Sequence, residues 1–175
     1  MTVPAWREEP ISKDHDRKSF DCGDPELNLF LQRYARQSHD AGGAKTFVAL
    51  DETDGRTVHG FYSVAPGNMG YARTPEILRR GLGQHDVPGF ILARLATSRT
   101  LQGRGLGGQL LVAAARRCIT AAEQVGGAIL IIDAKNERVA NWYRSYGGIA
   151  LNDASNTLVM SLSSFAAKLR AAGHL

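Results

Sequence analysis

Four glycines occupy six consecutive positions in the middle of the chain, within the segment Gln102-Gly103-Arg104-Gly105-Leu106-Gly107-Gly108. An apolar segment that ends at Thr97 precedes them, and apolar residues at helical spacing follow over residues 106–122. Glycine has no Cβ, so the main-chain N–H groups of such a loop can approach one ligand closely. The start of the following helix adds about half a positive charge. The sequence therefore predicts a strand–loop–helix unit that binds a diphosphate group.

The rest of the chain is predicted to alternate strands and helices. Its 175 residues, 43% of them hydrophobic, suit one domain with a real core, and we expect a single domain over residues 1–175. The order of elements indicates an α/β or α+β fold. Strands are expected at residues 46–50, 58–65, 90–97, 128–133 and 157–162, and helices at residues 26–36, 106–122, 139–146 and 165–172, with a short helical piece near residues 75–80.

The helix expected at residues 26–36 has clear signals. Asp24 precedes Pro25, a pair typical of a helix N-cap and first turn. Leu27, Phe30, Leu31 and Tyr34 recur at helical spacing and predict one apolar face.

Composition excludes several other classes of protein. No apolar stretch approaches the roughly 20 residues that span a bilayer, and the N-terminal residues lack the apolar core of a signal peptide, which predicts a cytoplasmic protein. Cys22 and Cys118 have no CxxC spacing, and the five histidines are scattered. We therefore expect no metal site.

Positive charge is concentrated in the middle of the chain. Residues 1–72 have a net charge of −3, whereas residues 73–117 contain eight arginines and two acidic residues, a net charge of +6. Such a block suits a phosphate-rich ligand or partner, although a solvated basic face gives the same pattern.

Two families bind phosphates with a loop of this kind. Gly103, Gly105 and Gly108 satisfy G-x-G-x-x-G, and Asp133 ends the next strand, as in dinucleotide-binding folds. The glycines, however, begin several residues after the strand, and only one clear strand–helix–strand unit follows.

The segment also resembles the acyl-CoA motif Q/R-x-x-G-x-G/A of the GCN5-related N-acetyltransferase (GNAT) superfamily, through Gln102, Gly105 and Gly107. Residues 133–148, with Asn136 and a "WYRSYGG" phrase that contains Tyr143, resemble a second motif of that superfamily. The resemblance implies a mixed, mainly antiparallel twisted sheet flanked by helices, with a splayed central strand at residues 92–97. It implies acetyl-CoA as co-substrate, held by Leu95, Ala96, Thr97, Gln102, Gly103, Arg104, Gly105, Leu106, Gly107, Gly108 and Asn136.

Acetyl transfer from a thioester needs a held carbonyl and a proton for the leaving thiolate. The strand with Leu95 and Ala96 can offer a main-chain N–H to the thioester oxygen. The resemblance makes Tyr143 the candidate acid. No carboxylate stands on that strand as a general base, which favours an α-amine of pKa about 7.7–8.0 over a lysine amine of about 10.4.

Several phrases narrow the resemblance to the acetyltransferase toxins of type II toxin–antitoxin pairs. They are residues 20–23 followed by 27–31, residues 45–49, residues 60–64, Val87-Pro88 ahead of residues 92–96, and the connection from Arg79 to Pro88. This resemblance implies acetylation of the α-amino group of aminoacyl-tRNA, which blocks translation, and implies a homodimer that a ribbon-helix-helix antitoxin inactivates. The basic residues expected to contact RNA are Lys45, Arg79, Arg80 and Arg94. Two alternatives stay open: an acetyltransferase for a small amine or a protein lysine, and a non-enzymatic acyl-CoA-binding regulatory partner.

Overall fold

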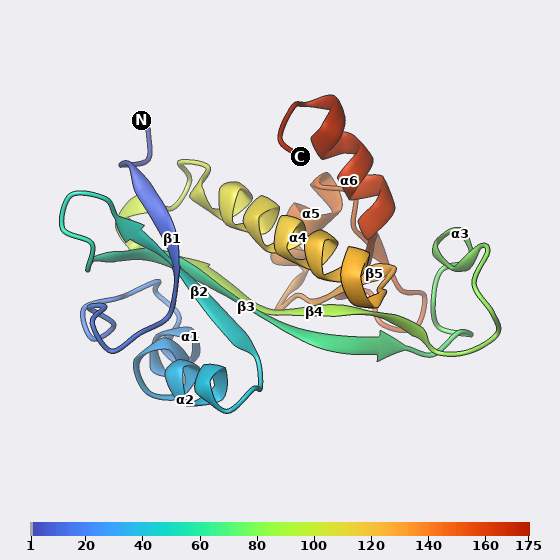
Figure 1. Cartoon of the computed structure of the whole chain (residues 1–175), viewed down its shortest axis with the longest axis horizontal. Coiled ribbons are helices and arrows are strands. Elements are labelled where there is room, and N and C mark those ends of the chain that lie inside the picture. The colour runs from blue at the N-terminus through green and yellow to red at the C-terminus, as the bar shows by residue number, and fades with distance from the viewer. Residues whose placement is uncertain (1) are drawn as a thin grey trace. The chain divides into compact units, whose positions relative to one another are not determined.

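Seven strands form a mixed sheet with the order β1-β2-β3-β4-β5-β7-β6, which confirms the predicted fold class (Figure 1). The computed structural model describes residues 2–175. Its elements are β1 (Trp6–Pro10), α1 (Pro25–Leu29), the π-helical turn η1 (Phe30–Tyr34), α2 (Ala35–Asp40), β2 (Lys45–Asp51), β3 (Val58–Met69), α3 (Glu76–Arg79), β4 (Val87–Thr97), the 3-10 turn η2 (Arg99–Leu101), α4 (Leu106–Val125), β5 (Ile129–Asp133), α5 (Glu137–Ser145), β6 (Ile149–Ala150), β7 (Thr157–Ser161) and α6 (Leu162–Ala171).

Strand pairing is mainly antiparallel. The pairs β1·β2, β2·β3, β5·β7 and β6·β7 are antiparallel, whereas β4 and β5 are parallel. The register of β4 with β5 runs from Gly89↔Ile129 to Leu92↔Ile132, and β4 then continues to Thr97. The second half of β4 is therefore the part of the strand that the family resemblance predicts to be splayed.

The chain divides into two compact units. The first contains the residues up to Ala65 together with Ala93–Ala114, and the second contains Pro66–Leu92 and Ala115–Leu175. Strands β3 and β4 and helix α4 each run through both units.

The core of the first unit lies between its helices and strands β2 and β3, with α1 and α2 below these strands in Figure 1. Leu31 and Phe61 are fully buried there, and Phe20 packs edge-on to Phe61 at 5.6 Å between ring centroids. On β3, a Cβ on Gly60 would come within 2.8 Å of the Leu110 side chain of α4. Glycine at this position therefore allows helix α4 to pack closely on β3.

The first helix differs from the prediction in one respect. Asp24 caps α1 as expected, since its carboxylate accepts from the N–H groups of Glu26 and Leu27. The predicted continuous helix, however, contains the π-helical turn η1, in which the Ala35 N–H donates to the Phe30 carbonyl. Tyr34, expected on the apolar face, is 53% exposed. The wider turn shifts the helical phase by one residue and moves that position towards solvent.

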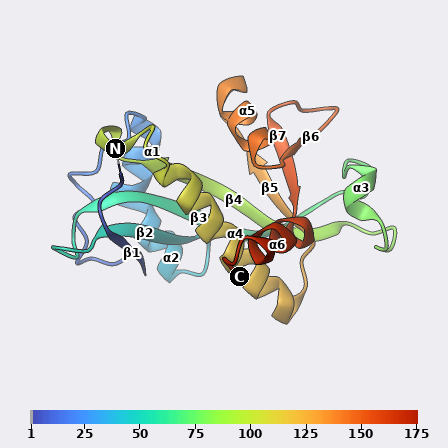
Figure 2. The ribbon, with the colours of Figure 1, turned by 90° about the horizontal axis from the view of Figure 1, so that it is seen from above.

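The second unit is built around β5. Residues Ile129–Ile132 of this strand are all buried, as the continuous apolar run predicted for a strand covered on both faces. Figure 2 shows β5, β7 and β6 side by side, with α5 next to them. None of the helices described within residues 2–175 is long and apolar enough to cross a membrane.

Candidate functional site

Strand β4 leads into the glycine-rich loop through a short turn. The Ser98 N–H donates to the His59 carbonyl at 2.8 Å, and η2 follows. Gln102 therefore comes five positions after Thr97, the last residue of the strand. A dinucleotide-binding turn follows its strand almost at once. The observed delay favours the acyl-CoA interpretation of the loop.

The glycines differ in the conformations that they adopt. Gly103 and Gly105 have φ angles of 78° and 91°, in the left-handed region that favours glycine. A Cβ on either residue would meet no atom within 4 Å, so both face open space. Gly107 and Gly108 belong to the first turn of α4. The first N–H groups of a helix have no intrahelical partner, and with this open space they fit a diphosphate.

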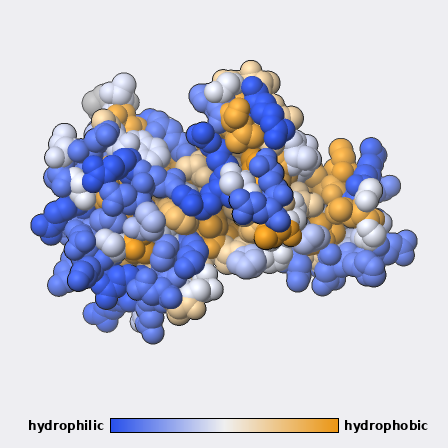
Figure 3. Space-filling view, viewed as in Figure 1, coloured by the Kyte–Doolittle hydropathy of each residue, from blue (hydrophilic) through white to orange (hydrophobic). Residues whose placement is uncertain are grey.

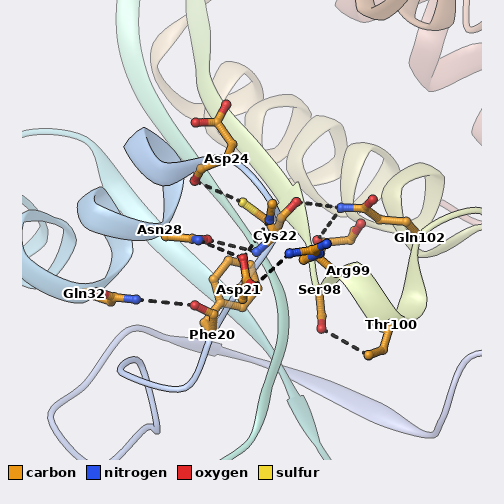
Figure 4. A network of polar contacts seen from close by, with 12 residues as sticks. Phe20, Asp21, Cys22, Asp24, Asn28, Gln32, Ser98, Arg99, Thr100 and Gln102 are labelled. Atoms are coloured by element: carbon orange, nitrogen blue, oxygen red, sulfur yellow. Dashed lines mark hydrogen bonds and ion pairs between the residues drawn. The ribbon is translucent and has the colours of Figure 1, made fainter.

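The Gln102 side chain contacts the end of β4 and a segment near position 22 (Figure 4). Its Nε2 donates to the Thr97 carbonyl at 3.1 Å and to the Cys22 carbonyl at 2.8 Å. Arg99 lies beside it, and its Nη1 is 3.5 Å from the Oδ2 of the Asp21 carboxylate. The loop is thus connected to residues near position 22, which the sequence did not predict to belong to the site.

A hollow of about 500 Å³ is lined by Arg104 together with the N-terminal segment at residues 2–6. Trp6 of that segment donates from Nε1 to Oε1 of Gln109, in the first turn of α4, at 2.8 Å. The sequence offered no signal for this contact, because β1 is a short strand rich in charged residues.

Asn136 and Tyr143 lie in the second unit, at the start and the middle of α5. The Asn136 Oδ1 accepts from the Val139 N–H at 2.9 Å and so caps the helix. Tyr143 is 6% exposed and packs against Trp142, with 4.9 Å between ring centroids. Burial raises the pKa of Tyr143 to about 12, so its hydroxyl keeps its proton at neutral pH.

The four predicted RNA contacts have different surroundings. In the first unit, Lys45 is exposed and donates from Nζ to the His39 carbonyl at 2.7 Å, whereas Arg94 is half-buried over the Phe30 ring. Burial lowers the pKa of Arg94.

In the second unit, Arg79 donates to the Tyr71 carbonyl at 2.7 Å and lies over the Tyr71 ring, and Arg80 is exposed. Ile77 and Leu82, 62% and 37% exposed, lie close to these arginines in the sequence, and hydrophobic atoms gather over α3 at the right of Figure 3.

The predicted acyl-CoA residues of β4 and the loop all lie in the first unit, within the segment from Leu95 to Gly108. Asn136 and Tyr143 share one helix of the second unit. Within residues 2–175, no group of three or more histidine, cysteine or acidic residues could hold a metal ion.

A scan against models of known protein families finds no match. The chain is 38% identical over 133 residues to the tRNA-acetylating toxin of Mycobacterium tuberculosis (strain ATCC 25618 / H37Rv), a match that covers 76% of this chain and 78% of that protein.

Two solved structures resemble the fold closely. AtaT complexed with acetyl-methionyl-tRNAfMet has a TM-score of 0.87 and 28% identity, and the match covers 94% of this chain and 99% of AtaT. A tyrosine-to-phenylalanine mutant of AtaT, bound to the C-terminus of the antitoxin AtaR and to acetyl-CoA, has a TM-score of 0.79 and 28% identity, with 91% and 95% covered. The sequence motifs, the fold and these likenesses together show that the chain belongs to the tRNA-acetylating toxins of the GNAT superfamily.

Proposed function

We propose that this protein transfers an acetyl group from acetyl-CoA to the α-amino group of an aminoacyl-tRNA and thereby blocks translation. One observation carries the proposal: over about three quarters of its length, the chain is 38% identical to a tRNA-acetylating toxin. The structure of AtaT with acetyl-methionyl-tRNAfMet supports the same acceptor.

The residues at the end of β4 fit acetyl-CoA. Open space beside Gly103 and Gly105 would receive the pyrophosphate, and the N–H groups at the start of α4 would bind it. The main chain of Leu95, Ala96 and Thr97 would hold the pantetheine arm. The rest of Gln102–Gly108 completes the loop, and Asn136 would contact acetyl-CoA from the start of α5.

When bound, acetyl-CoA supplies an acetyl group whose thioester carbonyl carbon is attacked by the acceptor amine. The new C–N bond replaces the C–S bond, the attacking nitrogen loses a proton to solvent, and the leaving thiolate takes a proton. A main-chain N–H of Leu95 or Ala96 would stabilise the carbonyl oxygen as it gains negative charge. Tyr143 would donate the proton to the thiolate from its hydroxyl, which is protonated at neutral pH, and would regain a proton from solvent.

The acceptor needs little help to lose its own proton. The second half of β4 reads Ala-Arg-Leu-Ala-Thr and contains no carboxylate. An α-amine, with a pKa of about 7.7–8.0, is partly neutral at physiological pH, whereas a lysine amine is not. This difference supports aminoacyl-tRNA over a protein lysine as the acceptor.

We also propose that Lys45, Arg79, Arg80 and Arg94 bind tRNA phosphates, in a salt-dependent manner. The two compact units would act together as one GNAT domain, because β3, β4 and α4 each run through both. The complex of AtaT with AtaR supports an antitoxin partner. We further propose that this antitoxin is of the ribbon-helix-helix type, that the toxin is a homodimer, and that it acts in the cytoplasm.

The experiment compares acceptors. The purified protein is incubated with labelled acetyl-CoA and charged tRNA, deacylated tRNA, spermidine or a lysine peptide. We expect label only on charged tRNA, and much less with Tyr143→Phe. Label on spermidine or the peptide, with none on charged tRNA, would contradict the proposal.

A further inference from the structure

Two hydrogen bonds connect the turn at residues 21–23 to the segment that leads into the glycine-rich loop, one at the start of η2 and one from Gln102, the first residue of the loop (Figure 4). At the start of η2, the Arg99 N–H donates to the Asp21 carbonyl at 2.9 Å. After η2, the Gln102 Nε2 donates to the Cys22 carbonyl at 2.8 Å. The same Nε2 donates to the Thr97 carbonyl, so Gln102 also closes the turn that leaves β4.

The turn at residues 21–23 is fixed in its own right by Asn28 of α1. The Asn28 Oδ1 accepts from the Cys22 N–H, and its Nδ2 donates to the Asp21 Oδ1, both at 2.9 Å. The Gly23 N–H donates to the same carboxylate oxygen at 2.8 Å. These bonds from Asn28 and Gly23 lower the pKa of Asp21, so its carboxylate stays ionised at neutral pH.

Packing holds this turn against the rest of the first unit. Phe20 and Cys22, at 4% and 9% exposure, lie in the hydrophobic core together with Ala96 of β4. Asp24 caps α1 directly after the turn. The turn, the end of β4 and helix α1 are therefore joined by both apolar and polar contacts.

The chemistry of the Gln102 amide indicates how this residue acts. A glutamine amide has two N–H donors, and in Gln102 the amide nitrogen is engaged by two protein carbonyls. A group so engaged positions the loop main chain. The diphosphate is left to the N–H groups at the start of α4.

We propose that Asn28, Asp21 and Gln102 form a brace that holds the glycine-rich loop in its acetyl-CoA-binding conformation, with Gln102 as a positioning residue. The proposal rests on the proposed function of the loop. Asn28 fixes the turn, the turn carbonyl of Cys22 receives Gln102, and Gln102 sets where the loop leaves the strand. A loop held in place before binding loses less conformational freedom on binding.

The test measures the dissociation constant of acetyl-CoA by calorimetry on the full chain without tRNA, together with kcat and the KM values for acetyl-CoA and charged tRNA. Asn28→Ala removes the amide that fixes the turn without touching the loop. Gln102→Glu keeps the side-chain shape but removes both donors. Gln102→Arg restores donors. Glu26→Gln, an exposed change on α1, is the control.

We expect Asn28→Ala and Gln102→Glu to raise the Kd and the KM for acetyl-CoA about five- to tenfold, the effect of losing a hydrogen bond or two. The kcat at saturating acetyl-CoA and the KM for charged tRNA stay within about twofold, since catalysis and tRNA binding use other groups. Gln102→Arg returns towards the wild-type constants, and Glu26→Gln matches them.

A residue that served stability alone would lower the melting temperature and leave both constants unchanged. A folded Asn28→Ala with the wild-type Kd would therefore overturn the proposal, and if this variant does not fold, Gln102→Glu decides in the same way. Gln102→Arg binding as weakly as Gln102→Glu would also overturn it. If wild-type protein binds acetyl-CoA but does not acetylate charged tRNA, the proposed acceptor fails, while the Kd values still test the brace.

Discussion

The Arg94 guanidinium lies over the ring of Phe30, with 3.6 Å between Cζ and the ring centroid. Phe30 is itself buried and stacks against Phe61, with 6.2 Å between ring centroids. An aromatic face attracts a cation electrostatically. Arg94 therefore combines a packing contact with a positive charge held beside Leu95, at the point on β4 where acetyl transfer is proposed.

Arg94→Ala is expected to act on both stability and RNA binding. Loss of the contact with Phe30 should lower the free energy of unfolding by about 1 kcal/mol. Loss of one phosphate contact should reduce the slope of log affinity for tRNA against log salt by about 1. Arg80→Ala, at an exposed position, should reduce the slope with little change in stability. An unchanged slope for Arg94→Ala would show that Arg94 serves packing and does not contact a tRNA phosphate.

Gly105→Ala is expected to weaken acetyl-CoA binding. The φ angle of Gly105, 91°, costs an L-residue roughly 1–2 kcal/mol, and the added side chain would project into the space proposed for the pyrophosphate. Gly105→Val should abolish binding. Gly42→Ala is the matched control, because Gly42 also has a left-handed φ, of 80°, and a Cβ there also meets no atom within 4 Å. Calorimetry decides, and wild-type affinity in Gly105→Val would remove the loop from the mechanism.

Local sequence patterns predict several of the elements described above. Asp24 and Pro25 predict the start of α1, the continuous apolar run predicts the buried strand β5, and the four glycines predict a strand–loop–helix unit for a phosphate ligand, which the family resemblance narrows to acyl-CoA. The π-helical turn at Phe30–Tyr34 does not follow from such patterns. Apolar spacing fits a continuous helix equally well, and one extra residue in a turn leaves no mark in composition. The same limit explains why Tyr34 was expected to be buried.

Asn136 is expected to have two separable roles. Asn136→Ala removes the cap of α5 and should cost about 1 kcal/mol of stability, with a lower kcat because α5 carries Tyr143. Asn136→Asp keeps the oxygen that accepts from Val139 but loses the amide donor. It should retain stability and bind acetyl-CoA more weakly. Unfolding and calorimetry on both variants test this, and equal acetyl-CoA affinity in wild type and Asn136→Asp would reduce Asn136 to a cap.

The pH dependence should reflect the acceptor amine and not Tyr143. Because the pKa of Tyr143 is raised to about 12, its proton remains in place throughout an assay between pH 6.5 and 9. The rate should therefore rise with pH as the α-amine, of pKa about 7.7–8.0, loses its proton. A falling rate between pH 8 and 9, measured as initial kcat/KM, would show that another group supplies the proton.

The same shift has a consequence for stability. The pKa of tyrosine is about 10 in the unfolded chain and about 12 in the folded one. The stability that protonated Tyr143 contributes to the folded state is fully present below pH 10 and is lost as the pH rises through 12. Between pH 9 and 11, urea unfolding should show a larger loss of stability for wild type than for Tyr143→Phe, and an equal loss would contradict the shift.

The polar contacts around the loop could not be predicted from the sequence. Cys22 and Gln102 are separated by 80 residues, and the bond joins a side chain to a main-chain carbonyl. Residue type carries little information about which carbonyl a glutamine will meet. The sequence identified the segment around Asp21 and Asn28 only by its family resemblance, and gave it no role. The fold, which brings this turn to the end of β4, supplies that role.

The most direct test of the central claim locates the acetyl group on the product. Charged tRNA is treated with the protein and acetyl-CoA and digested with nuclease, and the released 3′-terminal adenosine is analysed by mass spectrometry. We predict N-acetyl-aminoacyl-adenosine in the wild-type reaction and little of it with Tyr143→Phe. An acetyl group on a base or a ribose, or an unmodified aminoacyl-adenosine, would contradict the account.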